Sequence, residues 1–298
     1  MDNLRNQTNS SFRQKWTNGS TAFLNTTMDE GSEIFSWITN RNGFQSSLDV
    51  TEWLRPRKRV LDAGCGNGRV TNLLRRYMPP DAELLGIDFS SHEIAASNFG
   101  ELPNTDFQFA DLIQDLSHLG TFDLIYCQEV LHHTQDPQRA FKNLTEILAP
   151  EGEIAIYVYK KKAEIREFSD DFIRGRIKDL SYEESKEVID QITNFAKVVS
   201  QIPGEFSFPA ISVLGMNETH VSLHRFIYNN LFKNFWNEEL SYEENFLINF
   251  DWYHPSLCSR HTLSEILGWY ADSNLTVIHA KEDDFGITVR GTCPKESK

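Results

Sequence analysis

The sequence predicts an α/β fold with a mainly parallel sheet, and three observations carry this prediction. Between about residues 58 and 160, short apolar runs alternate with amphipathic segments, as strands do when helices connect them. Residues 262–290 resume this pattern with one helix and two further strand-like runs. Since 40% of the 298 residues are hydrophobic, the chain can also bury a substantial core.

The expected elements follow one another in a regular order. Strands are expected at residues 60–61, 83–87, 107–110, 122–127 and 153–159. Helices are expected at residues 70–77, 92–97 and 137–148, and the pair Pro79-Pro80 ends the first of them. Thr262 and Glu265 form a capping-box pair for a further helix. Residues 275–280 and 285–290 then predict a C-terminal antiparallel hairpin, which completes a seven-stranded sheet.

Two other stretches lack the rhythm of strands. Residues 1–50 are polar at first and then carry a short apolar helical stripe, which predicts an N-terminal helical cap. Residues 161–261 are rich in aromatics and in helical charge patterns, with breaks at Pro203-Gly204 and Gly215. We expect this stretch to be a helical insertion that covers the substrate as a lid. The sheet domain would then comprise residues 51–160 and 262–298.

Charge and cysteine usage exclude several classes of protein. The net charge of −14 repels phosphate backbones and argues against a nucleic-acid partner. The four cysteines lie too far apart for a zinc site, so neither a metal centre nor a disulfide framework is expected. The polar amino terminus lacks the apolar core of a signal peptide, and no run approaches the roughly 20 apolar residues that span a bilayer. We therefore expect a cytoplasmic protein with no membrane partner.

The most informative segment is Asp62-Ala63-Gly64-Cys65-Gly66-Asn67-Gly68-Arg69, in which a strand leads into a turn with glycine at every second position. Glycine permits unusual dihedral angles and lets a ligand approach the main chain closely. A tight strand-to-helix turn with no ligand is the alternative. Arg69 stands where a pyrophosphate-binding turn has its third glycine, so the ligand is expected to lack a pyrophosphate.

Two carboxylates follow the next two strands. Asp88 stands at the carboxyl end of the second expected strand, where an acid can accept hydrogen bonds from both hydroxyls of a ribose. The alternative is a helix N-cap, for which Ser90 and Ser91 compete. Asp111 closes the third strand in the same way and could accept from an adenine amino group. A loop carboxylate that faces water is an equal alternative for Asp111.

Six motifs then stand in a recognisable order along the chain. They are residues 62–68, 86–90, 109–112, 122–125, 129–133 and 148–153. Their order resembles that of class I S-adenosylmethionine-dependent methyltransferases, and the resemblance covers roughly residues 55–160 and 262–292. One departure is Glu151, where the family usually has a glycine in its turn. The resemblance implies a Rossmann-like fold, S-adenosylmethionine as the cofactor and methyl transfer as the activity.

The resemblance also implies a role for each matching residue. Gly64 and Gly66 would lie against the methionine part of the cofactor, with Asp62 reaching its amino group. Asp88 would hold the ribose, and Phe89 would pack on the adenine. The remaining cofactor residues would be Asp111 and the backbone of Leu112 at the adenine edge, and Gln128 near the methionine and the transferable methyl group.

Methyl transfer from a sulfonium mainly requires that a nucleophile be aligned with the methyl carbon and that water be excluded. A general base is needed only where the acceptor must lose a proton early. His132 and His133 follow the fourth expected strand, and either could take that proton. The alternative is structural: one histidine packs between strand and helix while the other bonds the backbone.

The expected insertion offers candidate substrate-binding residues. They are Asp171, Arg174, Arg225, Tyr228, Trp252, Tyr253 and His254. An acid and a base about one helical turn apart share a face, as Asp170 and Arg174 would, but a solvated surface pair looks the same in sequence. The aromatic residues that precede Pro255 could shape a dry pocket or form the insertion's own small core. Lys15 and Trp16 could fold over the cofactor or simply attach the N-terminal segment to the surface.

Together these observations predict a methyltransferase that acts on a small-molecule metabolite or natural product, on oxygen first and nitrogen second. A peptide or protein terminus or side chain is an alternative acceptor. A nucleotide-dependent oxidoreductase or epimerase is the alternative from another enzyme class, and Arg69 counts against it. A catalytically inactive cofactor-binding protein is a third alternative. The identity of the acceptor and the choice between monomer and homodimer are left open.

Overall fold

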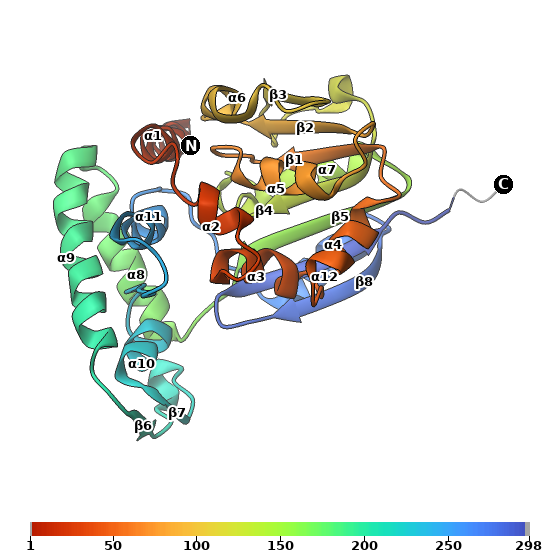
Figure 1. Ribbon diagram of the computed structural model, residues 1–298. Helices are drawn as coiled ribbons and strands as arrows, with labels where there is room; N and C mark the ends of the chain where they lie inside the picture. The colour runs from red at the N-terminus through yellow and green to blue at the C-terminus, as the bar shows by residue number, and fades with distance from the viewer. Residues whose placement is uncertain (1, 296–298) are drawn as a thin grey trace. The chain divides into compact units, whose positions relative to one another are not determined.

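The computed structural model describes residues 2–295, and the chain divides into two compact units (Figure 1). The sheet unit comprises Trp16–Lys160 and the chain from Leu257 onward. The helical unit comprises the chain up to Lys15 and Lys161–Ser256.

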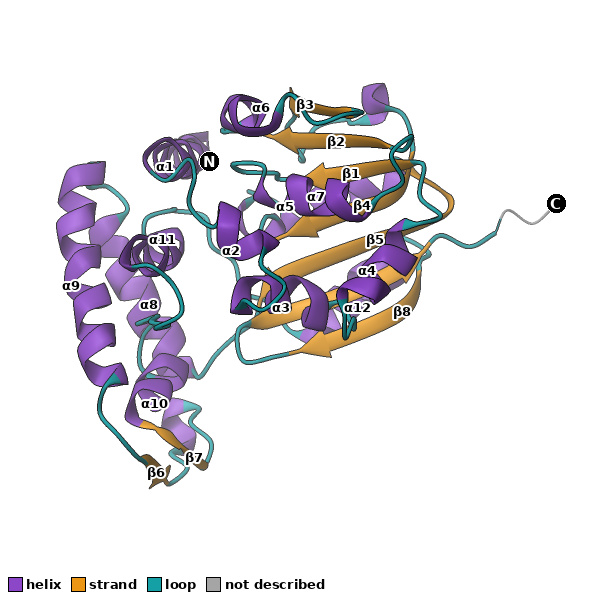
Figure 2. Ribbon diagram, viewed as in Figure 1, coloured by secondary structure: helices purple, strands orange, loops and turns teal. Residues whose placement is uncertain are grey.

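The sheet unit is built on one seven-stranded sheet, in the order β3-β2-β1-β4-β5-β9-β8 (Figure 2). Its strands are β1 (Arg59–Ala63), β2 (Glu83–Asp88), β3 (Thr105–Phe109), β4 (Phe122–Gln128), β5 (Leu148–Tyr159), β8 (Thr276–Glu282) and β9 (Gly286–Thr292). The first five strands are parallel, and β9 pairs antiparallel with both β5 and β8. The predicted α/β Rossmann-like fold, with its mainly parallel sheet and C-terminal antiparallel hairpin, is confirmed.

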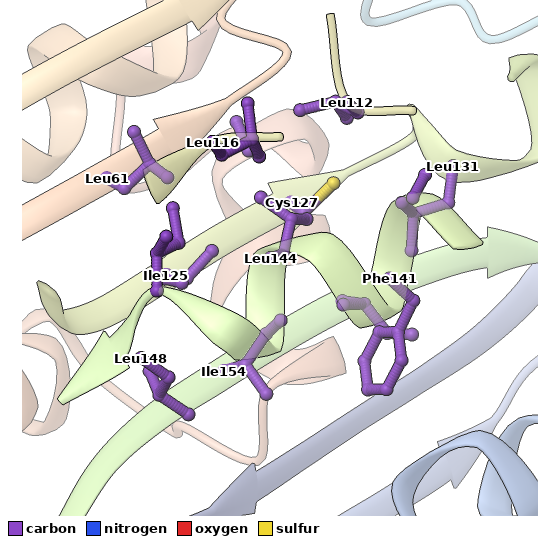
Figure 3. Packing of buried hydrophobic residues seen from close by; sticks show 14 of the residues in the cluster. Leu61, Leu112, Leu116, Ile125, Cys127, Leu131, Phe141, Leu144, Leu148 and Ile154 are labelled. Carbon is purple, nitrogen blue, oxygen red and sulfur yellow. The ribbon is translucent and has the colours of Figure 1, made fainter. Parts of the chain in front are cut away.

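Helices cover both faces of this sheet because neighbouring residues of each buried strand point to opposite sides. Val60 belongs to one apolar cluster and Leu61 to the other, and Leu124 and Ile125 divide in the same way. The cluster of Val60 includes residues of α3 (Glu33–Arg41), α4 (Ser47–Leu54) and α5 (Arg69–Tyr77). The cluster of Leu61, part of which is drawn in Figure 3, includes residues of α7 (Pro137–Glu146) and α12 (Leu263–Asp272).

Local chemistry sets several helix ends in this unit. The predicted capping box at the start of α12 is confirmed, since the Thr262 side chain accepts from the Glu265 amide and the Glu265 side chain accepts from the Thr262 amide. Helix α7 ends at Glu146, before the predicted residue 148. Leu148 instead pairs with Phe122 at the start of β5, so strand pairing takes the residues that the apolar pattern assigned to the helix. Helix α6 (His92–Phe99) follows β2.

The N-terminal segment contains α1 (Asp2–Asn18) and α2 (Leu24–Met28) before α3. Residues 16–28 lie in the sheet unit, where side chains near the glycine turn hold their backbone. Asn67 Nδ2 donates to the carbonyls of Ser20 and Ala22 at 3.1 and 2.9 Å, and Asn98 Nδ2 donates to that of Ser20 at 2.9 Å. This part of the chain is therefore fastened to the glycine turn.

The helical unit contains α8 (Glu164–Ile177), α9 (Tyr182–Ser200), α10 (Leu223–Asn230) and α11 (Tyr242–Tyr253). It also contains a two-stranded hairpin, β6 (Glu205–Phe208) and β7 (Thr219–Ser222), which the sequence did not predict. The hairpin lacked a sequence pattern because its strands have four residues each and bury almost none of them. The predicted breaks are present, with positive φ at Gly204 and Gly215.

Candidate functional site

The carboxyl ends of the parallel strands collect the residues predicted to bind a cofactor. Strands β1, β2, β3 and β4 are parallel neighbours, so the segments that follow them meet at one edge of the sheet. Asp62 and the glycine turn lie at the end of β1, Asp88 ends β2, Asp111 follows β3, and Gln128 ends β4. In open α/β sheets this edge, where the strand order reverses, is where ligands bind.

The glycine turn requires its glycines for reasons that lie within the protein. Gly64, Gly66 and Gly68 all have positive φ, which disfavours other residues. A Cβ on Gly64 would lie 2.2 Å from a methyl carbon of Val130, and one on Gly66 would lie 3.0 Å from the Trp16 indole. The backbone therefore approaches neighbouring side chains closely, whatever the ligand.

Asp88 joins this turn to the start of α6. Its Oδ2 accepts a hydrogen bond from the Gly66 amide at 3.1 Å. Its Oδ1 accepts from the amides and hydroxyls of Ser90 and Ser91 at 2.8–3.1 Å. The carboxylate thus braces the turn and the loop before α6, but it is not the helix N-cap, because that position is Ser91. The carboxylate is only half-buried, and it stays a candidate for the ribose.

Asp62 is 3% exposed, and its Oδ2 accepts a hydrogen bond from Thr71 Oγ1 at 2.6 Å. Burial raises the pKa of Asp62 to about 7, although the bond from Thr71 acts in the opposite direction. A buried carboxylate held near its titration point would be stabilised as the anion by a cation placed beside it. The amino group of the cofactor, which is the predicted partner of Asp62, would be such a cation.

The other predicted cofactor residues lie near strand ends with defined neighbours. The Phe89 ring lies 5.2 Å from that of Phe109. Asp111 Oδ1 accepts from the Ile113 amide at 3.3 Å, and the buried Leu112 offers its carbonyl to the side chain of Asn143 at 2.9 Å. Gln128 Oε1 accepts from the hydroxyl of Tyr126. The contacts of Asp111 and Leu112 fix the backbone on the predicted adenine side of the site.

Sequence reasoning missed an ion pair at the same edge. Glu129 follows Gln128 with φ 62°, a left-handed conformation that few non-glycine residues adopt. Its Oε1 accepts from Nη1 of the buried Arg41 at 3.2 Å, and Arg69 Nη2 lies 3.9 Å from its Oε2. A positive φ at a non-glycine residue is typical of functional sites. The sequence could not predict this conformation of Glu129.

The two candidate bases differ in how they are held. The buried ring of His132 packs on Tyr159 at 3.8 Å between ring centres, and its Nδ1 accepts from the Tyr159 amide at 3.4 Å. His133 Nδ1 lies 2.7 Å from the carbonyl of Leu257, which can only accept, so that nitrogen carries the proton. Nε2 is then the basic nitrogen of neutral His133. The packing of His132 on Tyr159 and the bond of His133 to the Leu257 carbonyl match the alternative in which both histidines are structural.

The candidate substrate residues of the helical unit fall into two groups. Tyr253 and His254 are buried within the unit: the Tyr253 hydroxyl bonds Asp170 Oδ1 at 2.9 Å, and His254 Nδ1 lies 2.8 Å from Ser11 Oγ. Burial lowers the pKa of His254. Tyr253 and His254 are therefore part of the helical unit's own core, which was the alternative to a role in substrate binding.

The second group is cationic and aromatic. Arg174 Nη1 bonds the exposed Asp171 at 2.6 Å, and its Nη2 donates to the carbonyl of Trp252 at 2.9 Å. Arg225 lies 5.5 Å from the centre of the Tyr228 ring. The structure adds Arg166, a fully buried residue that the sequence gave no reason to select.

Among residues 2–295, no helix is long and apolar enough to cross a bilayer. Within the same range, no group of three or more His, Cys, Asp or Glu side chains could hold a metal ion.

Comparison with known proteins finds a family match within the sheet unit. Residues 61–154 match the family model of a methyltransferase domain. This segment begins in β1 and ends in β5, so it includes the glycine turn and the three carboxylates at the edge of the sheet. This segment of the chain therefore matches a methyltransferase domain, in agreement with the resemblance of the motifs.

Curated relatives match about a third of the chain. A trans-aconitate 2-methyltransferase from Deinococcus radiodurans is 40% identical over 105 residues, which are 35% of this chain and 39% of the relative. A juvenile hormone acid O-methyltransferase from Bombyx mori is 34% identical over 109 residues, 34% of this chain and 38% of the relative. The chain thus spans less than half the length of these relatives. The family match at residues 61–154 does not include the helical unit's candidate substrate residues.

A solved structure, the N-methyltransferase NodS from Bradyrhizobium japonicum in complex with S-adenosyl-l-homocysteine, is 13% identical with a TM-score of 0.42. It covers 83% of this chain and 84% of that chain.

Proposed function

We propose that the chain transfers a methyl group from S-adenosylmethionine to an oxygen atom of a small-molecule metabolite. The observation that carries the proposal is the gathering of Asp62, Asp88 and Asp111 with the glycine turn at one edge of the sheet. The names of two relatives, one a methyltransferase of an acid and one an O-methyltransferase of an acid, support oxygen as the methylated atom.

The residues present fit the cofactor. Asp62 is a buried carboxylate whose pKa is raised to about 7 by burial, and a bound ammonium group would favour its ionised form. Asp88 would hold the ribose, with Phe89 and Asp111 on the adenine side and Gln128 toward the methionine. Arg69 replaces the third glycine of a pyrophosphate-binding turn, which agrees with a nucleoside ligand without phosphates.

The cofactor would supply an electrophilic methyl group on a sulfonium. The chain's own task is then to orient the acceptor oxygen and to exclude water. Where the acceptor is a hydroxyl, His133 Nε2 could remove its proton, because the bond to the Leu257 carbonyl keeps the proton of neutral His133 on Nδ1. A carboxylate acceptor needs no base.

Two measurements test this proposal. Calorimetric titration with S-adenosylmethionine, S-adenosylhomocysteine and NADPH should show binding of the two sulfur compounds alone. Binding of NADPH without them would favour the oxidoreductase alternative and overturn the proposal.

Incubation of the protein and methyl-labelled cofactor with a metabolite extract should then yield a labelled small molecule. Release of labelled methanol by alkali would identify a methyl ester, whereas an ether or an N-methyl group would survive. Label found only in protein would support the peptide or protein alternative. An absence of label despite cofactor binding would favour an inactive cofactor-binding protein.

A further inference from the structure

The helical unit contains a buried group of cationic and aromatic side chains, which we call the arginine cluster. It consists of Arg166, Arg174, Tyr228, Lys233 and Trp252, all of them buried. The Arg166 guanidinium lies 4.9 Å from the centre of the Tyr228 ring and 5.5 Å from that of Trp252. Lys233 Nζ and the Arg174 guanidinium lie 4.8 and 5.9 Å from the Trp252 ring. Three cations therefore surround one indole.

Arg166 is the cation best placed to bind an anion. Its side chain is 0% exposed, and its Nε donates to Asp170 Oδ2 at 2.6 Å. Nη1 and Nη2 have no hydrogen-bond partner among the residues that the structure describes. A buried guanidinium with two unmatched donors is destabilising, because those donors have lost water without replacement. The arrangement therefore fits a ligand that accepts from both nitrogens.

The neighbouring carboxylates do not satisfy these donors. Asp170 Oδ1 accepts from the Lys233 amide and the Tyr253 hydroxyl, both at 2.9 Å, and its Oδ2 is taken by Arg166 Nε. Asp171 is paired with Arg174 and its side chain is 56% exposed. The Asp170 carboxylate that lies against Arg166 repels a second negative charge beside it. A ligand with a single negative charge therefore fits this site better than a phosphate dianion.

We propose that the arginine cluster binds a carboxylate group of the methyl acceptor through Nη1 and Nη2 of Arg166. The two nitrogens of a guanidinium edge match the two oxygens of a carboxylate, and such charge-assisted pairs are strong. Tyr228 and Trp252 supply flat apolar surfaces for the carbon skeleton next to that carboxylate. This inference rests on the proposed function, since it names the class of acceptor as a carboxylic acid.

Binding of simple probes tests the site without any methyl transfer. The full chain would be titrated by calorimetry, at constant ionic strength and without cofactor, with benzoate, benzamide and phenyl phosphate. Benzoate should bind saturably and at least about tenfold more tightly than the neutral amide, because the charged pair is absent from benzamide. Equal affinity for benzoate and benzamide, or tighter binding of phenyl phosphate, would overturn the proposal.

Variants on a single helix locate the site. Arg166→Met should weaken benzoate binding at least about tenfold, while Arg176→Met, an exposed arginine of the same helix α8, should leave it unchanged. Arg166→Lys keeps the charge but loses the paired donors, so it should also bind benzoate more weakly than the wild type. This variant carries the test if Arg166→Met does not fold. If Arg166→Lys bound benzoate as tightly as the wild type does, the proposed contact of two arginine nitrogens with the carboxylate would be wrong.

The methionine end of the cofactor also bears a carboxylate, and one further titration separates the two sources. S-adenosylhomocysteine should bind Arg166→Met as it binds the wild type. If Arg166→Met instead no longer bound S-adenosylhomocysteine but still bound benzoate, the arginine cluster would be part of the cofactor site and the proposal would be wrong. A wild type that binds benzoate but neither sulfur compound would overturn the proposed function and leave the carboxylate site standing.

Discussion

The hydroxyl of Thr71 donates a 2.6 Å hydrogen bond to the buried carboxylate of Asp62 and so ties the first turn of α5 to the end of β1. Because burial raises the pKa of Asp62 to about 7, its charge changes near neutral pH. The pH dependence of both stability and cofactor binding should therefore report on this one group.

The affinity for S-adenosylhomocysteine should rise with pH up to about 7 and level off above it. The ammonium group prefers ionised Asp62, and below the pKa each binding event must first release a proton, so the affinity changes by up to about tenfold per pH unit. Calorimetry between pH 5.5 and 8.5 measures this. Asp62→Asn should bind weakly with a flat profile, and the exposed Glu101→Gln should behave as the wild type. A sloping profile in Asp62→Asn would assign the titration to another group.

The stability of the cofactor-free protein should change in the opposite direction. A carboxyl group whose pKa is higher in the folded state than in the unfolded state stabilises the fold at low pH, and this contribution is lost as the pH rises through about 7. Asp62→Asn should therefore gain stability relative to the wild type at pH 8, by an amount on the order of a few kcal/mol. Urea denaturation at pH 5 and pH 8 compares the two proteins. A variant that is less stable at pH 8 would contradict the assigned shift.

Asp88→Ala should weaken the binding of S-adenosylhomocysteine by about 1.5–3 kcal/mol, since charge-assisted hydrogen bonds are lost. Loss of the bond to the Gly66 amide could cause the same weakening, so a 2′-deoxy analogue is needed as a second ligand. If Asp88 holds the ribose, deletion of the hydroxyl should weaken binding to the wild type more than to the variant. Additive effects would restrict Asp88 to bracing the turn.

His132 and His133 should respond differently to substitution. His133→Gln should lower kcat toward a hydroxyl acceptor and flatten its pH profile, because Nε2 is the basic nitrogen. His132→Gln should mainly lower the melting temperature, because the fully buried imidazole packs on Tyr159 and accepts from its amide. Turnover and thermal denaturation of both variants decide between these roles. Unchanged turnover in His133→Gln would remove proton abstraction from this residue.

Glu153 should be the carboxylate on which the fold of the sheet unit depends most. It is 2% exposed, and its oxygens lie 2.6 Å from Arg290 Nε and 2.5 Å from Arg57 Nη2. Glu153→Ala should cost about 3–5 kcal/mol of unfolding free energy, since two largely buried cations lose their partner. Glu151→Ala, two residues away and exposed, is the control. Equal denaturation midpoints for the two variants would contradict this role.

The sheet and the glycine turn could be predicted because both depend on local patterns. Alternating apolar runs fix which face of a strand is buried, and an acid directly after a strand must lie at the edge of the sheet. Asp88 and Asp111 were predicted in this way, whereas the role of Asp62 was predicted from the family resemblance. No such pattern links Arg41 to Glu129, because 88 residues separate them in the sequence.

The helical unit was harder to predict because its chemistry depends on burial. Arginine is exposed in most proteins, so a sequence gives no reason to expect Arg166 in the interior. The spacing that placed acid and base on one face of a helix did not show that Asp170 would be buried and Asp171 exposed. Tertiary packing alone makes that distinction.

The order of the last strands sets the order in which the sheet unit can be assembled. Strand β9 follows β8 in the chain but lies between β5 and β8 in the sheet. During synthesis on the ribosome, β8 emerges with no neighbour to pair with, and one edge of β5 stays open until residues 286–292 have left the exit tunnel. A nascent chain that stops before residue 286 should therefore be prone to aggregation through that edge, and translation pauses there should recruit chaperones.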